Sequence, residues 1–331
     1  MKTIFHNGHL WRAACAFMTV VLMFTALNPA HAESYPERTV RIIVPYGAGG
    51  IADVTMRLVA QKLTGRFGQQ FIIDNRPGAG GAVGVKAAAS AAPDGYTLSM
   101  IGGGLTISAA LFKSLPYDLV NDFIPISTTA FYSLVIAAKA GSPLKTVQDV
   151  IAASRANPGK LNFGTINPGS NQHLSAELFR AMSGIKVTMI PYKTTPELVT
   201  ALVRGDIDVA FEYQAALQGS LDDRQIIAIA TTGRERASVL PNVPTVEESG
   251  IPDYEVTSWN GLAAPAGTPA NIVNLLNNRM NFALSLPDIK SAMAKFGMEA
   301  RGSTVDDLRA RIRHDIDKWT KVIETAGIEK K

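Results

Sequence analysis

Hydrophobic and polar positions follow two alternating periods along the first third of the chain. Short apolar runs of strand length occur at "TVRIIVPY" (39–46), "QFIID" (70–74) and "YTLSMI" (96–101). Between them, residues 51–66 and 81–91 have apolar positions at helical spacing. Alternation of strand-like and helix-like segments predicts a parallel sheet with helices on its faces.

A second set of the same kind follows the apolar segment "AFYSLVIAAKAG". Its expected helices are 146–157, 170–182 and 196–205, and its expected strands are 160–165, 186–192, 206–213 and 225–232. After "YEVTSWNGLAAPAG" the pattern is mainly helical, at 268–284, 288–296 and 304–326.

The last of these helices has the clearest pattern. Thr304 and Asp307 have the spacing of a capping box, and an apolar residue recurs every three or four positions from Leu308 to Ile323. We expect this helix to return to the first αβ set. The prediction is therefore two domains, the first made of 33–130 and 258–331 and the second of 131–257, joined by crossing segments near 128–138 and 254–264.

The first 32 residues have the pattern of a cleavable export signal. Lys2 and Arg12 accompany the apolar run "AACAFMTVVLMFTAL", and "AHA" ends at Ala32. The run is short for a membrane-spanning helix. We expect a mature chain that begins near Glu33 and lies in the periplasm, with a retained membrane anchor as the alternative.

Removal of this segment changes the chemistry available to the protein. It takes away Cys15, the only cysteine, and three of the five histidines, which leaves His173 and His314. The formal net charge falls from +4 to +2 because Lys2 and Arg12 are lost. These features argue against cysteine catalysis, a zinc site and nucleic-acid binding, and we expect no metal and no cofactor.

Glycine-rich segments follow four of the predicted strands. They are "YGAGG", "NRPGAGG", "GGGLT" and "GTINPGSNQH". In an open parallel sheet, ligands bind beyond the carboxyl ends of the strands, where backbone N–H groups and helix starts favour an anion. The alternative is that these glycines only permit tight turns.

Two other glycine-loop functions fit less well. Gly47, Gly49 and Ala52 match the variant dinucleotide fingerprint GxGxxA, and Asp74 ends the next strand, but export argues against a nicotinamide enzyme. A phosphate-binding loop would need a Lys-Ser or Lys-Thr pair after the glycines, and none follows.

Hydrolase chemistry has one candidate pair. Ser170 and His173 lie within one helical turn, but the chain has no GxSxG motif. Ser170 is interpreted as a helix cap, and His173 as a residue at the pocket edge or in a local hydrogen bond. Asp53 either meets the dipole at the start of its helix or faces the cleft, and the sequence leaves both open.

The order and spacing of these motifs resemble the Bug family of periplasmic solute receptors of tripartite tricarboxylate transporters. The resemblance covers essentially the whole mature chain, from "YPERTVRIIVPYGAGGIADVTMRLVAQKL" through "NPGKLNFGTINPGSNQHLSAELF" and "LPNVPTVEESG" to "KWTKVIETAGI". It implies a type II-like periplasmic binding protein with two αβ lobes, each a mainly parallel sheet flanked by helices. The lobes would close over a small carboxylate that is delivered to a membrane permease.

The resemblance also implies which residues contact the ligand. In the first lobe these are Tyr46, Gly47, Ala48, Gly49, Gly50 and Asp53; in the second they are Thr165, Ser170, His173, Tyr192, Lys193 and Thr194. The glycine segment after the third strand adds Gly103, and closure of the second lobe is expected to bring Phe211 over the ligand. The family's first loop is usually PFAPGG, whereas this chain has "PYGAGG", and Thr194 stands where PYKG would have glycine. Both departures fall on expected ligand positions.

The main hypothesis is thus a monomeric binding protein, not an enzyme, for a dicarboxylate, an acidic amino acid or an aromatic acid. Arg76 and Lys193 are the cations in the candidate loops, so backbone amides are expected to make most contacts and to give micromolar affinity. One alternative is a secreted enzyme that uses His173 or Asp53 as a base. Another is a ligand-sensing receptor without a transport role.

Overall fold

The computed structural model describes residues 35–330. The predicted export signal at 1–32 lies outside this range. A compact unit begins at Arg38 and contains every feature described below.

The first sheet is built around β1 (Val40–Val44), which is parallel to β2 (Phe71–Asn75) and β3 (Thr97–Gly102). Antiparallel strands extend it: β9 (Thr257–Pro265) pairs with β3, β4 (Phe123–Lys139) pairs with β9, and β10 (Glu299–Ala300) pairs with β4. Four of the five residues of β1 are buried, which fits a central strand covered on both faces.

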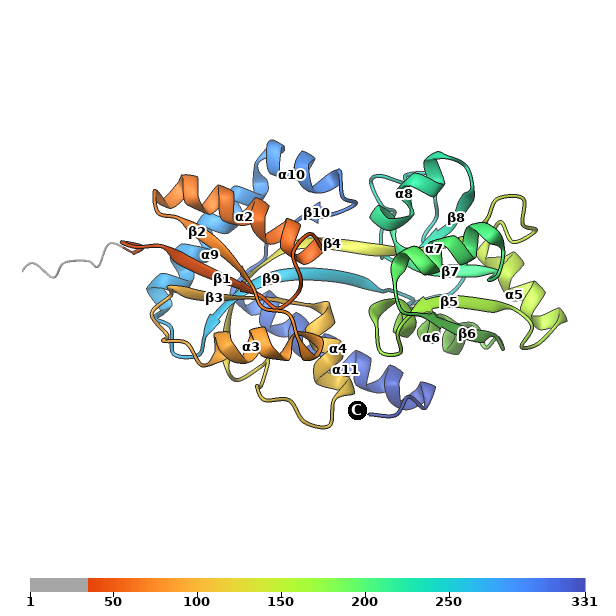
Figure 1. Cartoon of the computed structure of the whole chain (residues 1–331), viewed down its shortest axis with the longest axis horizontal. Coiled ribbons are helices and arrows are strands. Elements are labelled where there is room, and N and C mark those ends of the chain that lie inside the picture. Colours follow the sequence, from red (N-terminus) through yellow and green to blue (C-terminus); the bar gives the residue numbers. More distant parts are fainter. Residues whose placement is uncertain (1–34, 331) are drawn as a thin grey trace, which may run out of the picture. The chain divides into compact units, whose positions relative to one another are not determined.

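Helices cover this sheet and form the first lobe with it (Figure 1). One of them was not expected: α4 begins at Gly103, directly after β3, where the sequence predicted only a glycine loop. The helices are α2 (Ile51–Phe67), the 3-10 helix η1 (Ala79–Gly81), α3 (Ala82–Ala89), α4 (Gly103–Leu111), α9 (Ala270–Ser285) and α10 (Pro287–Ala294).

The second sheet has a parallel part and an antiparallel part. Strand β5 (Asn162–Ile166) is parallel to β6 (Thr188–Tyr192) and β7 (Val209–Tyr213), while β7 and β8 (Ile226–Thr231) are antiparallel to β4. Its helices complete the second lobe: α5 (Val147–Ala156), α6 (Asn171–Ser183), α7 (Thr195–Arg204) and α8 (Gln214–Asp222). Helix α8 was also not predicted.

Strand β4 belongs to both sheets. It pairs with β9 from Phe123 to Ser133 and then with β7 from Leu134 to Ala138. Figure 1 shows β4 and β9 running between the two groups of helices. These strands overlap the two segments that the sequence predicted to cross between the domains.

Helix α11 (Val305–Ala326) packs on both lobes. Its capping box is present, since Thr304 and Asp307 bond to each other's backbone N–H. Leu308 and Ile312 pack with the core of the first lobe. Trp319 and Ile323 pack with residues of the second lobe, a contact that the apolar stripe alone did not predict.

Helix α4 also joins the two lobes. Ile107, Ala110 and Leu111 belong to the same core cluster as residues of α6. The loop before α6 approaches this helix so closely that a Cβ at Gly169 would lie 2.3 Å from Leu111 Cδ2. Gly169 also has a φ of +86°, in the left-handed region, so both space and conformation require glycine.

We expect Gly169→Ala to lower the free energy of unfolding by about 2 to 4 kcal/mol, because the methyl group adds left-handed strain and a clash with Leu111. Urea denaturation of the mature protein measures this. Gly219→Ala is the control: Gly219 lies on α8 with nothing within 4 Å of a Cβ, so alanine should be neutral or stabilising. Equal stability of Gly169→Ala and wild type would contradict the packing described here.

Candidate ligand-binding site

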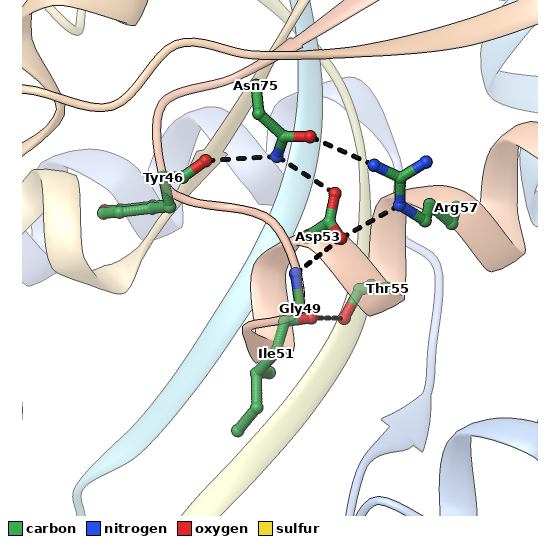
Figure 2. A network of polar contacts seen from close by, with 7 residues as sticks. All are labelled: Tyr46, Gly49, Ile51, Asp53, Thr55, Arg57 and Asn75. Atoms are coloured by element: carbon green, nitrogen blue, oxygen red, sulfur yellow. Dashed lines mark hydrogen bonds and ion pairs between the residues drawn. The ribbon is translucent and has the colours of Figure 1, made fainter. Parts of the chain in front are cut away.

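A buried carboxylate holds the first glycine loop in place (Figure 2). Asp53, which is 2% exposed, lies in the first turn of α2. Its Oδ2 accepts hydrogen bonds from the backbone N–H of Gly49 at 2.8 Å and from Arg57 Nε at 2.9 Å. Its Oδ1 accepts from Asn75 Nδ2 at 3.0 Å. Both carboxylate oxygens are thus used inside the protein.

Asn75 closes this network at the carboxyl end of β2. Its Nδ2 also donates to the backbone carbonyl of Tyr46 at 3.1 Å, and its Oδ1 accepts from Arg57 Nη2 at 3.1 Å. The loop is therefore tied at two points, Tyr46 and Gly49, to α2 and β2. Asn75 was not among the predicted site residues; its signal in the sequence is an amide that ends a strand at the second glycine segment.

The surroundings of Asp53 favour its ionised form. Burial alone would raise the pKa of this carboxyl, but hydrogen bonds from Arg57, the Gly49 N–H and Asn75 outweigh burial and lower the pKa below its usual value of 3.8. A carboxyl group whose pKa is lower in the folded than in the unfolded protein stabilises the fold at neutral pH. This contribution is lost as the pH falls through the folded-state pKa.

We expect Asp53→Asn to lower the free energy of unfolding at pH 7 by about 1.5 to 3 kcal/mol, because the amide cannot accept all three hydrogen bonds. The difference from wild type should shrink as the pH falls below about 4, because the unfolded chain then binds a proton at Asp53 before the folded protein does. Urea denaturation at pH 7 and at pH 3 measures both effects. Asp306→Asn, at an exposed position on α11, should change stability by less than about 0.5 kcal/mol.

The glycine loop itself is exposed and has unusual room around it. Gly47, Ala48, Gly49 and Gly50 are all exposed. A Cβ at Gly47 would meet nothing within 4 Å, and one at Gly50 would meet only the Gly47 carbonyl at 3.9 Å. Gly49 needs its positive φ of +84°, but Gly47 and Gly50 do not have left-handed φ values. Neither packing nor conformation explains glycine at 47 and 50.

The start of α2 lies in this open region. Its N-cap is Gly50, and no side chain caps the helix. The first backbone N–H groups of a helix have no intrahelical acceptor and carry about half a positive charge. The loop therefore presents hydrogen-bond donors next to space that the protein does not fill.

The third glycine segment has a different explanation, because each of its glycines allows a close approach. A Cβ at Gly102 would lie 2.6 Å from the Trp259 carbonyl, and one at Gly104 would lie 2.8 Å from the Tyr46 hydroxyl. At Gly103 the nearest atom would be Ser258 Oγ, at 3.2 Å. These glycines bring the start of α4, which also lacks a side-chain cap, against β9 and Tyr46.

In the second lobe, Ser170 and His173 form a local structure at the start of α6. Ser170 Oγ accepts from the His173 backbone N–H at 3.1 Å and donates to the Ile166 carbonyl at 3.1 Å. His173 is buried, its Nδ1 accepts from the Gly169 N–H at 3.4 Å, and its Nε2 lies 3.8 Å from Glu177 Oε1. The Ser170 hydroxyl thus contacts backbone groups of α6 and β5.

The remaining predicted residues of this lobe lie at strand ends. Thr165 is fully buried, and its hydroxyl has no hydrogen-bond partner within residues 35–330. Tyr192 is partly buried at the end of β6, and Lys193 is exposed beside it. Thr194 is exposed too and caps α7 by accepting from the Glu197 N–H at 3.4 Å, which gives the threonine a structural role.

Phe211 is separated from this group. Its side chain is fully buried, and its ring centroid lies 5.6 Å from that of Phe163 and 5.7 Å from that of Phe179. The ring therefore belongs to the apolar core of the second lobe and is not available to a ligand at the surface.

Glu212, which the sequence analysis missed, resembles Asp53 in its role. It is 1% exposed, and its carboxylate accepts from Gln172 Nε2 at 2.9 Å, the Tyr213 N–H at 2.7 Å and Thr195 Oγ1 at 2.8 Å. Burial raises the pKa of this carboxyl, and the hydrogen bonds oppose the rise. Glu212 thus joins the end of β7 to the starts of α6 and α7.

Tyrosines from both lobes meet near the start of α4. The rings of Tyr132, on β4, and Tyr213, at the end of β7, have centroids 5.3 Å apart. The Tyr132 hydroxyl donates to Asn260 Oδ1 at 3.1 Å, and the Tyr213 hydroxyl accepts from Asn171 Nδ2 at 3.0 Å. Burial raises the pKa of Tyr46, and the nearby Tyr117 and Tyr213 raise it further.

A cavity of about 470 Å³ lies elsewhere, between β4, β9, α11 and residues 233–239. None of the predicted ligand residues lines it. Within residues 35–330, no three histidines, cysteines or carboxylates come together in a way that could hold a metal ion. In the same range, no helix has the length and apolar character needed to cross a bilayer.

Comparison with known proteins gives the family. The model of the tripartite tricarboxylate transporter family receptor matches residues 55–328. The protein BugT of Bordetella pertussis is 33% identical over 305 residues, which cover 92% of this chain and 94% of BugT.

Solved structures agree with this result. The Rpa4515 protein of R. palustris with adipate is 32% identical, with a TM-score of 0.77 over 89% of this chain and 99% of that one. MatC of Rhodopseudomonas palustris with bound malate is 29% identical, with a TM-score of 0.71 over 87% and 100%. The periplasmic binding protein BugD is 28% identical, with a TM-score of 0.74 over 90% and 100%.

The motif resemblance and the predicted fold class are thereby confirmed. The chain belongs to the Bug family of periplasmic solute-binding receptors of tripartite tricarboxylate transporters, and it has their two-lobed α/β fold.

Proposed function

We propose that this protein is an extracytoplasmic receptor that binds a small organic carboxylate at the glycine loop of the first lobe and delivers it to a membrane permease. The observation that carries the proposal is the open space at Gly47 and Gly50, beside the uncapped start of α2. A carboxylate there would accept hydrogen bonds from main-chain N–H groups and meet the positive end of the helix dipole.

The ligands of similar proteins support this ligand class. The Rpa4515 structure contains adipate and the MatC structure contains malate, and both are carboxylates. The Asp53 network adds a physical reason, because it fixes the loop before any ligand arrives and so lowers the ordering cost of binding.

The proposed site in the second lobe consists of Thr165, Ser170, His173, Tyr192, Lys193 and Thr194, without Phe211. The unpartnered hydroxyl of Thr165 favours a ligand or water group close to the end of β5. The ligand would be held between the lobes, as expected for a receptor that selects a closed state on binding.

Binding is favoured over catalysis by the state of the two candidate bases. Both oxygens of Asp53 accept hydrogen bonds within the protein, one of them from Arg57, and the pKa of this carboxyl is lowered, so it is a poor proton acceptor. His173 is buried, and Ser170 is engaged with backbone groups. We therefore propose a receptor that is not an enzyme, is monomeric and works in the periplasm.

We expect the melting temperature of the mature protein to rise by about 5 °C when its carboxylate ligand is present at a concentration about 100 times the Kd. A panel of dicarboxylates, acidic amino acids and aromatic acids, followed by differential scanning fluorimetry, tests this.

Gly50→Val should weaken binding at least tenfold while costing less than about 1 kcal/mol of stability, because position 50 has extended backbone and room for a side chain.

The matched control is Gly65→Val, an exposed position in the second half of α2 with nothing within 4 Å of a Cβ. This variant should keep wild-type affinity. Failure of every organic acid to shift the wild-type melting temperature, or chemical conversion of a bound acid, would contradict the proposed function.

We also expect Lys193→Ala to weaken carboxylate binding by about tenfold at unchanged stability, because Lys193 is an exposed cation beside the proposed site. Isothermal titration measures the change. Lys186→Ala removes an equally exposed cation just before the other end of β6 and should have no effect. Equal affinity of Lys193→Ala and wild type would remove Lys193 from the site.

A further inference from the structure

Four phenol side chains gather around the start of α4. Tyr46 follows β1, Tyr117 lies between α4 and β4, Tyr132 is on β4, and Tyr213 ends β7. Burial raises the pKa of Tyr46, and the nearby Tyr117 and Tyr213 raise it further. Burial also raises the pKa of Tyr117 and of Tyr213 to about 12, so both remain neutral at physiological pH.

Two of these hydroxyl groups have partners within the protein and two have none. Tyr132 donates to Asn260, and Tyr213 accepts from Asn171. By contrast, the Tyr117 hydroxyl is buried without a hydrogen-bond partner within residues 35–330. The Tyr46 hydroxyl, which lies against Gly104, also makes no hydrogen bond to any residue of this range.

The Tyr117 hydroxyl is buried as well as unpaired, and native proteins rarely leave such a group without a partner. Tyr46 is also next to Gly47, where the open region of the proposed carboxylate site begins. A bound molecule that reaches from this loop towards α4 would meet the Tyr46 hydroxyl first. The two free phenols therefore fit a polar group of the ligand.

The charges near the phenols decide what kind of polar group fits. The charged group next to them is the buried Glu212 carboxylate, which accepts from the Tyr213 backbone N–H at 2.7 Å. A second carboxylate of the ligand would thus be desolvated beside an anion, whereas a neutral hydroxyl or carbonyl would not pay this cost.

We infer that this receptor recognises an organic acid with one carboxylate and, at a distance from it, a neutral hydroxyl or carbonyl group that bonds to the hydroxyls of Tyr46 and Tyr117. The inference rests on the proposed function and narrows its ligand class. It separates this chain from the similar proteins that hold adipate and malate, which are diacids. Tyr46 is the residue that sets the preference, because the sequence motif of the family has phenylalanine there.

Isothermal titration with two matched series tests the inference. One series is hexanoate, 6-hydroxyhexanoate and adipate, and the other is benzoate and 4-hydroxybenzoate. For wild type, we expect the hydroxy acid to bind about tenfold more tightly than its unsubstituted parent, and more tightly than the diacid. In Tyr46→Phe the ratio of hydroxy acid to parent affinity should fall to about one.

Tyr96→Phe is the matched control, because Tyr96 directly precedes β3 and so lies at the opposite end of that strand from α4. It should keep the wild-type ratio. Tyr117→Phe should also lower the ratio, without loss of stability in the absence of ligand, since its hydroxyl is unpaired.

The inference is wrong if wild type binds parent and hydroxy acid equally, if the diacid binds most tightly, or if Tyr46→Phe keeps the wild-type ratio. Any of these results would leave the proposed receptor function intact. Binding of no organic acid at all would overturn both.

Discussion

The hydrogen bond from the Gly49 N–H to the buried Asp53 carboxylate is the interaction on which the proposed site depends. A loop of exposed glycines has high conformational entropy, and by itself it would not hold its N–H groups in one direction. Asp53 and Asn75 remove this freedom at Gly49 and Tyr46, and Arg57 neutralises the charge that this requires. The loop can therefore remain open to solvent and still be ordered.

The second lobe uses the same arrangement with different residues. Glu212 takes the place of Asp53 as a buried carboxylate, and its bonds fix the starts of α6 and α7. In both lobes the carboxylate is buried and bonds to groups beside the helix starts. Each carboxylate thus orders its part of the proposed site, and Asp53 does so by taking the Gly49 N–H from the glycine loop.

The sequence predicted most elements but not the contacts between side chains. Strand β1 and helix α11 were predictable because apolar positions recur at the period of a strand or a helix over their whole length. Helix α4 was missed because Gly102, its N-cap, and Gly103 and Gly104, its first two residues, have low helix propensity. The close approach of Trp259 and Tyr46 that requires glycine there exists only after folding. The family resemblance predicted Tyr46 and Asp53 as site residues. It did not predict the hydrogen bonds of Asp53, because these depend on the position of Asn75 in the folded chain.

Phe211 and Glu212 show, within a single strand, why the sequence alone does not predict which side chains reach the site. Both lie near the carboxyl end of β7, where the sequence predicts ligand contacts, and adjacent residues of a strand point to opposite faces. The choice of face depends on the packing of Phe163 and Phe179 from two other elements, which no local pattern reveals. The sequence does carry one signal for the role of Glu212, which is a glutamate within an apolar run.

Strand β4 has a consequence for the whole compact unit. Its pairing passes from β9 to β7 between Ser133 and Leu134, with no unpaired residue in between. Loss of either sheet would expose backbone groups of the same strand and weaken the other sheet. We therefore expect the two lobes to unfold together, because one strand belongs to both of their sheets.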